Sequence, residues 1–441
     1  MIMFINRRRS AIVFSLLAYI FIFFPYLNIL PGLLPFETAP FAGFFSLLYI
    51  GITFTIYTMH TGKLPAIYLF LIVFTFLLAP LYYRYEFADI AGYQAFYNKT
   101  AFSLLLGIAV FTFAALTEEK INKTFVSLVL LFWIGSGLIQ ISPFVRVFNK
   151  FLQVINTRSV GSVNSRGIQL LANEPSYAGI ILVFFLLLIN FPDIRRNYRR
   201  IHRLFFTVCI GLMIILTRSA SALVYLLFLV MIIILFNIFP IRVKKILVVI
   251  LLSAGIYCGY QTIPHSPRHM ETRSMKLLIL LKNNPSRIFV DHSISSRLQY
   301  LIMSYYGLID SKGLGHGIGS YSFRWRYIAQ KLDILKKFPH AWNITRDYSA
   351  KASLMPMSFY GGIAHDMGVF GLLFFLGLTF SPAWFMIKKK ELFSSYEKKY
   401  IFISTAMVFF TWLQACSFAM PYPWLMLGLN YSFYRRRGIE L

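Results

Sequence analysis

LFFTVCIGLMIILTRSASALVYLLFLVMIIILFNIF, residues 204–239, is the stretch that decides the fold of this chain. Its single charged residue, Arg218, divides it into two apolar runs, 204–217 and 220–239. Apolar runs of roughly 17–25 residues form membrane-spanning helices, because only a helix satisfies its own backbone hydrogen bonds in hydrocarbon. The stretch therefore predicts two spanning helices that turn at Arg218, although the first of them is short.

The same pattern extends over the whole chain. Of its 441 residues, 58% are hydrophobic, 18% aromatic and only 13% charged, which is far more apolar than a soluble domain of this length. We therefore expect an all-α polytopic membrane protein with about twelve transmembrane helices. The predicted spans are 11–30, 41–59, 65–83, 100–116, 124–142, 172–191, 204–217, 220–239, 246–263, 362–387, 400–416 and 418–434.

Short basic clusters assign the two sides of the membrane. The first span follows Arg7-Arg8-Arg9 and lacks a small-residue cleavage site, so we expect it to remain uncleaved, with a cytoplasmic N-terminus. Alternation then places four further clusters on the cytoplasmic side, as the positive-inside rule requires. They are Arg195–Arg200, Arg242–Lys245, Lys388–Lys390 and Arg435–Arg437. The same alternation puts the C-terminus in the cytoplasm and segments 84–99, 143–171 and 264–361 outside.

The long polar segment 264–361 separates spans one to nine, in residues 1–263, from the last three spans and the tail, in residues 362–441. Lysine and arginine greatly outnumber aspartate and glutamate in it, so it should attract anions. A solvated basic surface facing anionic lipid headgroups is the simpler alternative. In a soluble protein a formal charge of +27 would suggest nucleic acid, but here the cations are distributed by membrane side and we expect no nucleic-acid partner.

Two helices and a glycine-rich connection are predicted within this loop. Residues 295–310 and 320–337 have helical spacing with apolar and basic faces, suited to the membrane surface. Between them Gly313-Leu314-Gly315-His316-Gly317-Ile318-Gly319 predicts a mobile or tightly turned connection. It is a poor match to a phosphate-binding P-loop, because the strand and helix context is missing.

Glu174 opens the sixth predicted span from the outer side, within Asn173-Glu174-Pro175-Ser176. It has two interpretations. Asn173 or Glu174 can cap the helix, with the carboxylate complementing the helix dipole. Alternatively, a carboxylate at the membrane boundary near cations can orient a sugar hydroxyl or accept its proton.

Several arginines are candidate ligands for an anionic substrate. Arg218 lies at the predicted outer membrane face, where it either reaches lipid phosphate or contacts a substrate diphosphate, for which guanidinium offers a bidentate fork. Arg297 begins a predicted loop helix and is the second diphosphate candidate. Arg158 and Arg166 precede Glu174 in an outer loop and either guide a substrate or are solvated.

Histidine supplies a further candidate base. His365 begins the tenth predicted span beside Asp366, and the two could form a general-base pair; His340 competes with it. No H-E-x-x-H, G-x-S-x-G, paired-cysteine or D-x-D motif occurs, so nothing in the sequence calls for a metal and we expect no cofactor.

Taken in order, these pieces resemble the O-antigen polymerase and ligase superfamily (Wzy and WaaL type). The resembling segments are Asn173–Gly179, Thr217–Ser221, Arg297 with Gly313–Gly317, and Asp366–Gly371, within roughly residues 140 to 375. The resemblance implies a GT-C-like fold, metal-independent inverting transfer, undecaprenyl-diphosphate-linked glycans as donors, and diphosphate contacts from Arg218 and Arg297.

The resemblance favours one branch of that superfamily. The Glu174-Pro175-Ser176 motif looks more like the polymerases, which join repeat units into O-antigen, capsule or exopolysaccharide at the periplasmic face of the bacterial inner membrane. Ligases, which transfer glycan to lipid A-core, are expected to carry a histidine about ten residues before Asp366, where this chain has Met355-Pro356-Met357. A flippase or other transporter is the rival from another class. Expected partners are the lipid-linked oligosaccharide, membrane lipids and, as a further candidate, a chain-length regulator.

Overall fold

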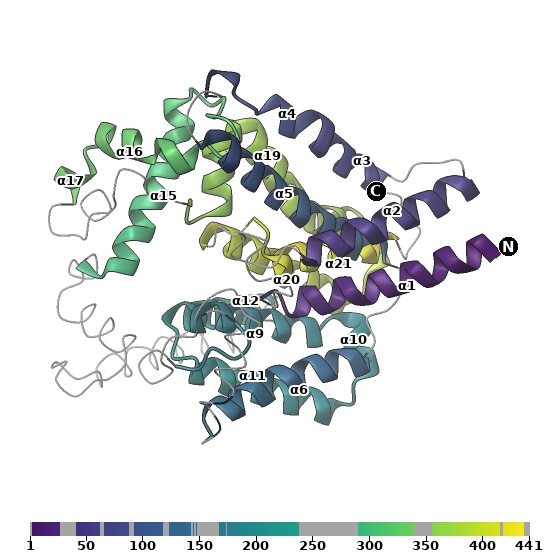
Figure 1. Ribbon diagram of the computed structural model, residues 1–441. Helices are drawn as coiled ribbons and strands as arrows, with labels where there is room; N and C mark the ends of the chain where they lie inside the picture. The colour runs from purple at the N-terminus through teal and green to yellow at the C-terminus, as the bar shows by residue number, and fades with distance from the viewer. Residues whose placement is uncertain are drawn as a thin grey trace, which may run out of the picture.

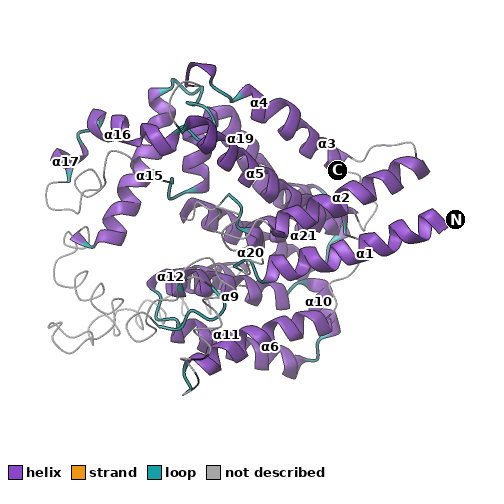
Figure 2. Ribbon diagram, viewed as in Figure 1, coloured by secondary structure: helices purple, strands orange, loops and turns teal. Residues whose placement is uncertain are grey.

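The computed structural model describes the chain in segments: residues 2–26, 41–61, 66–87, 92–117, 123–142, 144, 147, 167–172, 174–237, 290–338, 355–414 and 418–435. Within these residues every regular element is helical and no strand occurs, as expected for an all-α protein (Figures 1 and 2). The predicted ninth span, 246–263, lies outside the described residues.

The helices coincide with the apolar runs of the sequence. They are α1 (Ile2–Phe23), α2 (Phe41–Thr61), α3 (Ala66–Val73), α4 (Ala79–Leu81), α5 (Tyr93–Leu116), α6 (Lys123–Gln140), α9 (Pro175–Ile189), α10 (Pro192–Asn197), α11 (Arg200–Leu216), α12 (Ala220–Asn237), α15 (His292–Asp310), α16 (Tyr321–Lys331), α17 (Ile334–Lys337), α19 (Phe359–Lys388), α20 (Ser395–Gln414) and α21 (Pro421–Arg435). Each described predicted span is therefore a helix, with ends shifted by a few residues. The largest shift is in α1, which begins at Ile2 instead of residue 11.

Three of these helices are long and apolar enough by themselves to cross a membrane: α5, α6 and α19. The other apolar helices are shorter in the described residues, so a count of twelve spans stays a prediction. Large apolar side chains on α6 and α11, including Phe132 and Phe205, are exposed. A surface of this kind suits contact with lipid, and the fold is that of a helical membrane protein.

Small residues let the helices pack closely. A Cβ atom on Gly107 of α5 would lie 2.3 Å from Nε1 of Trp424 on α21, and one on Gly428 of α21 would lie 2.4 Å from the carbonyl oxygen of Phe111. Close approach of backbones through glycine is typical of helices that associate in membranes. The contact places α21 along the length of α5, although the two are distant in sequence.

Contacts between helix ends bring the basic clusters together. Arg196 pairs with the buried carboxylate of Glu397 at 3.2 Å, and the guanidinium of Arg195 lies 3.8 Å from the ring centroid of Tyr396. Arg435 donates a 2.6 Å hydrogen bond to the carbonyl of Leu116, which ends α5. These contacts place the 195–200 and 388–390 clusters at one end of the helices.

The predicted third span, 65–83, contains an irregularity. Its helix is α3 and α4 joined by η1 (Phe74–Leu78), a five-residue π-helix. The Thr75 hydroxyl donates to the carbonyl of Leu71 at 2.8 Å. A π-helix widens the turn, and such insertions frequently occur at functional sites.

The long loop folds into helices with a small core of their own. α15 and α16 enclose Tyr300, Met303 and Trp325, all fully or almost fully buried. The predicted helix 295–310 is confirmed, beginning three residues earlier, whereas 320–337 is broken into α16 and α17 at Asp333, whose φ is 50°. α15 to α17 gather at the end opposite the start of α1 (Figure 1), and α15 packs on α19.

Candidate functional site

α9 and α12 begin side by side. The approach depends on glycine: a Cβ atom on Gly179 would lie 2.1 Å from that of Ala222, and one on Gly167 would lie 2.1 Å from the carbonyl oxygen of Thr217. Ile168 donates a 3.2 Å hydrogen bond to the carbonyl of Leu216. The segment before Glu174 is therefore docked on the turn that holds Arg218.

Gln140, near the end of α6, fixes the same segment. Its buried amide oxygen accepts hydrogen bonds from the backbone N–H groups of Gln169 and Leu170 at 2.9 and 3.0 Å, and its amide nitrogen donates to the carbonyl of Leu170 at 2.8 Å. Leu170 has a φ of 51°, an unfavourable conformation for a residue with a Cβ atom. Three hydrogen bonds from one side chain hold it there, so the outer end of α9 is rigidly positioned.

Glu174 is the N-cap residue of α9 by its backbone, with φ −146° and ψ 151°. Its side chain accepts no hydrogen bond from the helix backbone; instead it accepts one from the Ser176 hydroxyl at 3.3 Å. The carboxylate is half-buried. The Glu174 carboxylate thus lies at the positive end of the helix dipole but does not cap the helix. Asn173, the other capping candidate, lies outside the described residues.

Arg218 sits in the tight turn between α11 and α12 with a φ of 50° and an exposed side chain. Thr217 and Ser219, on either side of Arg218, are buried, and each hydroxyl makes a hydrogen bond to the backbone at a helix end. Thr217 donates to the carbonyl of Ile214 at 2.7 Å, and the Ser219 hydroxyl accepts from the N–H of Ala222 at 3.3 Å. A residue other than glycine keeps this left-handed backbone conformation only where the contacts around the turn hold it in place.

Arg297 reaches the same turn from α15. Its Nη1 donates a 3.2 Å hydrogen bond to Oγ of Ser221, in the first turn of α12, and its side chain is exposed. Arg297 therefore contacts the start of α12, three residues after Arg218 in the chain, although it is 76 residues from Ser221. A helix N-terminus with two guanidinium groups beside it is a favourable environment for an anion.

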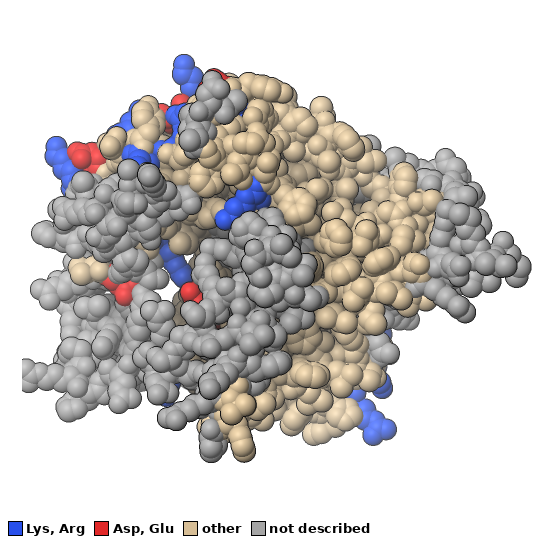
Figure 3. Space-filling model, in the orientation of Figure 1, with Lys and Arg blue, Asp and Glu red and all other residues tan. Residues whose placement is uncertain are grey.

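Basic side chains gather at more than one place on the face drawn in Figure 3. Many lie over the region of α15 to α17, together with some acidic ones, and a smaller group lies near α10. Arg158 and Arg166, the remaining cationic candidates, lie outside the described residues, as does His340.

The glycine-rich connection is a docking segment. The N–H groups of His316 and Gly317 donate to the carbonyls of His365 and Asp366, each at 2.8 Å. A Cβ atom on Gly315 would lie 2.5 Å from the backbone nitrogen of Gly368, where α19 is kinked. Because these amides already donate hydrogen bonds to protein oxygens, they are not available to a phosphate. The sequence predicted either a mobile or a tightly turned connection, and the structure shows a tightly turned one.

His365 and Asp366 also serve this docking. His365 is completely buried; its Nδ1 lies 2.9 Å from Asp366 Oδ1 and 3.3 Å from the Ser320 hydroxyl, and its ring fills the space beside Gly307. Asp366 accepts from the N–H groups of Gly319 and Tyr321 at the start of α16. His365 has no exposed surface in this structure. A general-base role for the pair therefore stays a prediction.

A charged cluster that the sequence analysis did not identify lies next to His365 and Asp366. Asp310, at the end of α15, pairs with Arg324 and Lys331 of α16, and Nε2 of His316 lies 3.2 Å from its carboxylate. Burial would raise the pKa of Asp310, but the Lys331 hydrogen bond and the surrounding cations lower it overall. Burial lowers the pKa of His316 to about 4, with the charges of His365 and Arg324 adding to the effect. Sequence reasoning could not pair these residues, because they meet only when α16 folds back on α15.

Among the described residues no three His, Cys, Asp or Glu side chains gather as a metal site would require. The chain matches no protein-family model and no curated protein.

Proposed function

We propose that this protein is a polysaccharide polymerase, a GT-C-like glycosyltransferase of the bacterial inner membrane. It joins undecaprenyl-diphosphate-linked oligosaccharide repeat units into O-antigen, capsular or exopolysaccharide at the periplasmic face. A chain-length regulator is a candidate partner. Membership of the O-antigen polymerase and ligase superfamily is part of the proposal and rests on the resembling motifs.

The observation that carries the proposal is the hydrogen bond from Arg297 to Ser221. It joins the loop helix α15 to the first turn of α12, which follows Arg218 directly in the chain, and the side chains of both arginines are exposed. A diphosphate carries several negative oxygens, and paired arginines bind such groups through bidentate hydrogen bonds. Membrane-embedded helices around the turn suit a substrate whose other end is a lipid.

The arrangement supports a direct displacement. The hydroxyl oxygen of an acceptor sugar forms a bond to the anomeric carbon of the donor, while the bond from that carbon to the diphosphate oxygen breaks. The diphosphate leaves with the bonding electrons, and Arg218 and Arg297 stabilise the charge that develops on it. The configuration at the anomeric carbon is inverted.

Glu174 is the group that we assign to the acceptor. Its carboxylate is half-buried at the start of α9, beside the start of α12, and is not consumed by helix capping. In the proposed reaction it accepts the proton of the attacking hydroxyl. His365 is left out of the chemistry because it is buried in the contact between α19 and the glycine-rich segment.

The proposal is tested by deleting the gene in its host and restoring it with wild type, Arg218→Ala, Arg297→Ala or Glu174→Ala at matched membrane levels. Surface polysaccharide is then separated on a gel. Wild type should restore the ladder of chain lengths, and each arginine variant should reduce polymer synthesis by about 10²–10³-fold, the usual effect of removing a group that stabilises developing charge. Lys336→Ala is the matched control, because this loop lysine is 86% exposed and far from the turn in sequence.

The products identify the reaction. Core-lipid bearing one repeat unit, without a ladder, is expected of the deletion strain. Loss of all repeats from lipid A-core while long chains accumulate on the lipid carrier would instead indicate a ligase. Glycan retained on the cytoplasmic side would indicate a transporter and contradict the proposed transferase.

A further inference from the structure

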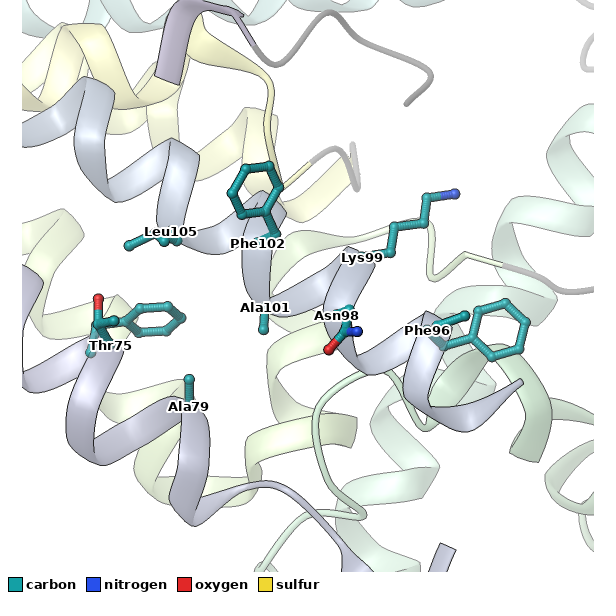
Figure 4. Close-up of a pocket in the computed structure, with 10 residues that line it drawn as sticks. Thr75, Ala79, Phe96, Asn98, Lys99, Ala101, Phe102 and Leu105 are labelled. Atoms are coloured by element: carbon teal, nitrogen blue, oxygen red, sulfur yellow. The ribbon is translucent and has the colours of Figure 1, made fainter. Parts of the chain in front are cut away.

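A groove of about 660 Å³ lies between η1 and α5, on residues that the proposed transferase site does not use. Phe74, Thr75 and Ala79 form one wall, and Ala101, Phe102 and Leu105 of α5 belong to the other (Figure 4). The π-helix and the small side chains of the facing alanines leave this space between the two helices. It runs along a helix that is long and apolar enough to cross a membrane.

Three polar residues among those described line the groove: Thr75 near one end, and Asn98 and Lys99 toward the other (Figure 4). The hydroxyl of Thr75 is engaged by its own helix, and Asn98 accepts a hydrogen bond from Gln94 at 2.8 Å. Lys99 is half-buried at the rim and has no hydrogen-bond or ion-pair partner in the part of the chain that the structure describes. The groove is therefore an apolar channel with one uncompensated cation at its edge.

The end that carries Lys99 faces the same side of the molecule as the loop helices. A Cβ atom on Gly319 would lie 2.6 Å from the backbone of Phe96, and Ile318 donates to the carbonyl of Tyr82 at 3.0 Å. From Lys99 to Leu105 the α5 axis rises by roughly 9 Å. The cation thus stands near the membrane boundary, and the apolar walls extend from it into the span.

We propose that this groove holds one acyl chain of an anionic phospholipid whose phosphate pairs with Lys99. A single ammonium balances the single charge of a phosphodiester, and the apolar walls take the hydrocarbon. The lipid-linked diphosphate fits less well, because it carries more charge and no guanidinium group is among the described residues that line this groove. The proposal does not depend on the transferase reaction.

The test is native mass spectrometry of the detergent-purified full chain with added phosphatidylglycerol, using phosphatidylcholine as the zwitterionic comparison. Wild type should retain phosphatidylglycerol more tightly. Lys99→Gln should weaken it by about fivefold, the effect of one basic residue at a lipid surface, and Lys99→Arg should restore it. Ala101→Phe should remove binding by filling the groove, and Lys336→Gln should leave it unchanged. Size-exclusion profiles show whether each variant is folded.

Equal retention of phosphatidylglycerol by wild type and Lys99→Gln would overturn the proposal, as would binding that Ala101→Phe does not affect in a folded protein. Displacement of the phospholipid by undecaprenyl phosphate at equal concentration would also overturn it and assign the groove to a prenyl chain. These outcomes are separate from the polymer assay, so failure of one proposal does not decide the other.

Discussion

Ser320, His365 and Asp366 form a buried polar group at the start of α16. One oxygen of Asp366 accepts a 2.8 Å hydrogen bond from Gly319, and the other lies 3.2 Å from the Ser320 hydroxyl and 2.9 Å from His365. All three side chains are buried, and such groups are costly to leave unpaired. The three side chains pair through Nδ1 of His365, whereas its Nε2 is buried without a hydrogen-bond partner among the described residues. A structural role for this group is one interpretation, which mutation can test.

This assignment predicts the effect of His365→Gln. The variant should lower the free energy of unfolding by about 1–3 kcal/mol, because it disturbs a buried hydrogen-bonded group, yet polymer synthesis per folded molecule should stay within about twofold. Glu174→Gln should instead reduce synthesis by about 10²-fold or more with little change in stability. The measurement is turnover of a lipid-linked repeat unit, normalised to the folded fraction. A stable His365→Gln protein without activity would restore His365 as the base.

His316 predicts how stability depends on pH. Its pKa is about 4 when folded, against 6.5 ordinarily, so the unfolded chain binds a proton that the folded protein does not. The stability that neutral His316 contributes is complete above pH 6.5 and is lost as the pH falls through the folded pKa, toward 4. Asp310, whose pKa is also lowered, adds a further loss at more acidic pH.

The corresponding experiment follows the thermal unfolding midpoint between pH 7.5 and 4.5 in detergent. Wild type should lose stability over this range, and His316→Gln should show a shallower dependence. Identical slopes for the two proteins would mean that His316 titrates normally. Asp310 does not contribute within this pH range, because its pKa is lowered from an ordinary value of 3.8.

At the scale of elements, the glycine-rich segment joins α15 and α16 to the kink in α19. Gly313 accepts a 2.8 Å hydrogen bond from Val369, and Gly368 at the kink has a φ of 67° and a ψ of −157°. Two backbones in direct contact leave no room for side chains. This contact explains glycine at position 315; Gly317 and Gly319 lie against Arg84 and Phe96 instead, and all four glycines of the segment have a positive φ. The segment thereby fixes the loop against α19 and α5.

Gly315→Ala tests that docking. Gly315 has a φ of 80°, and its new Cβ atom would lie 2.5 Å from the Gly368 nitrogen, so both the backbone and the contact are strained. We expect the thermal midpoint and polymer synthesis to fall together. Gly377→Ala is the matched control, because nothing lies within 4 Å of the added atom, and alanine in a helix interior stabilises by about 0.5–1 kcal/mol relative to glycine. Equal behaviour of the two variants would contradict the docking.

The helices could be predicted because hydrocarbon imposes one rule on every apolar run. Their contacts could not. The register that brings Arg297 to Ser221 depends on how α15 packs against α19, and no local pattern encodes it. His365 was assigned to chemistry because a histidine beside an acid has the same local pattern in a buried polar group as in a base. The π-helix likewise could not be predicted, because residues 66–81 form one uninterrupted apolar stretch of sequence.

At the scale of the whole molecule, the ends of the helices differ in what they carry. One end holds α15 to α17 and the turn with Arg218, and the other holds the contacts of Arg196 with Glu397 and of Arg435 with Leu116. α19 lies between the loop lysines and Lys388–Lys390; it is kinked at Gly368, and by length and composition it is a candidate to cross a membrane. We therefore expect one crossing to separate the two groups of lysines.

That separation predicts the result of labelling from one side of the membrane. Lys336→Cys and Lys389→Cys are each introduced after Cys209, Cys258 and Cys416 have been replaced by alanine. Both sites are exposed, so each thiol is accessible where water reaches it. A maleimide that cannot cross the inner membrane should label the Lys336→Cys protein in intact cells, and the Lys389→Cys protein only after permeabilisation. Labelling of both proteins in intact cells would contradict the predicted topology, because α19 would then not cross the membrane. Arg218 and Arg297 would then no longer be expected at the periplasmic face, where an exported lipid-linked glycan is found.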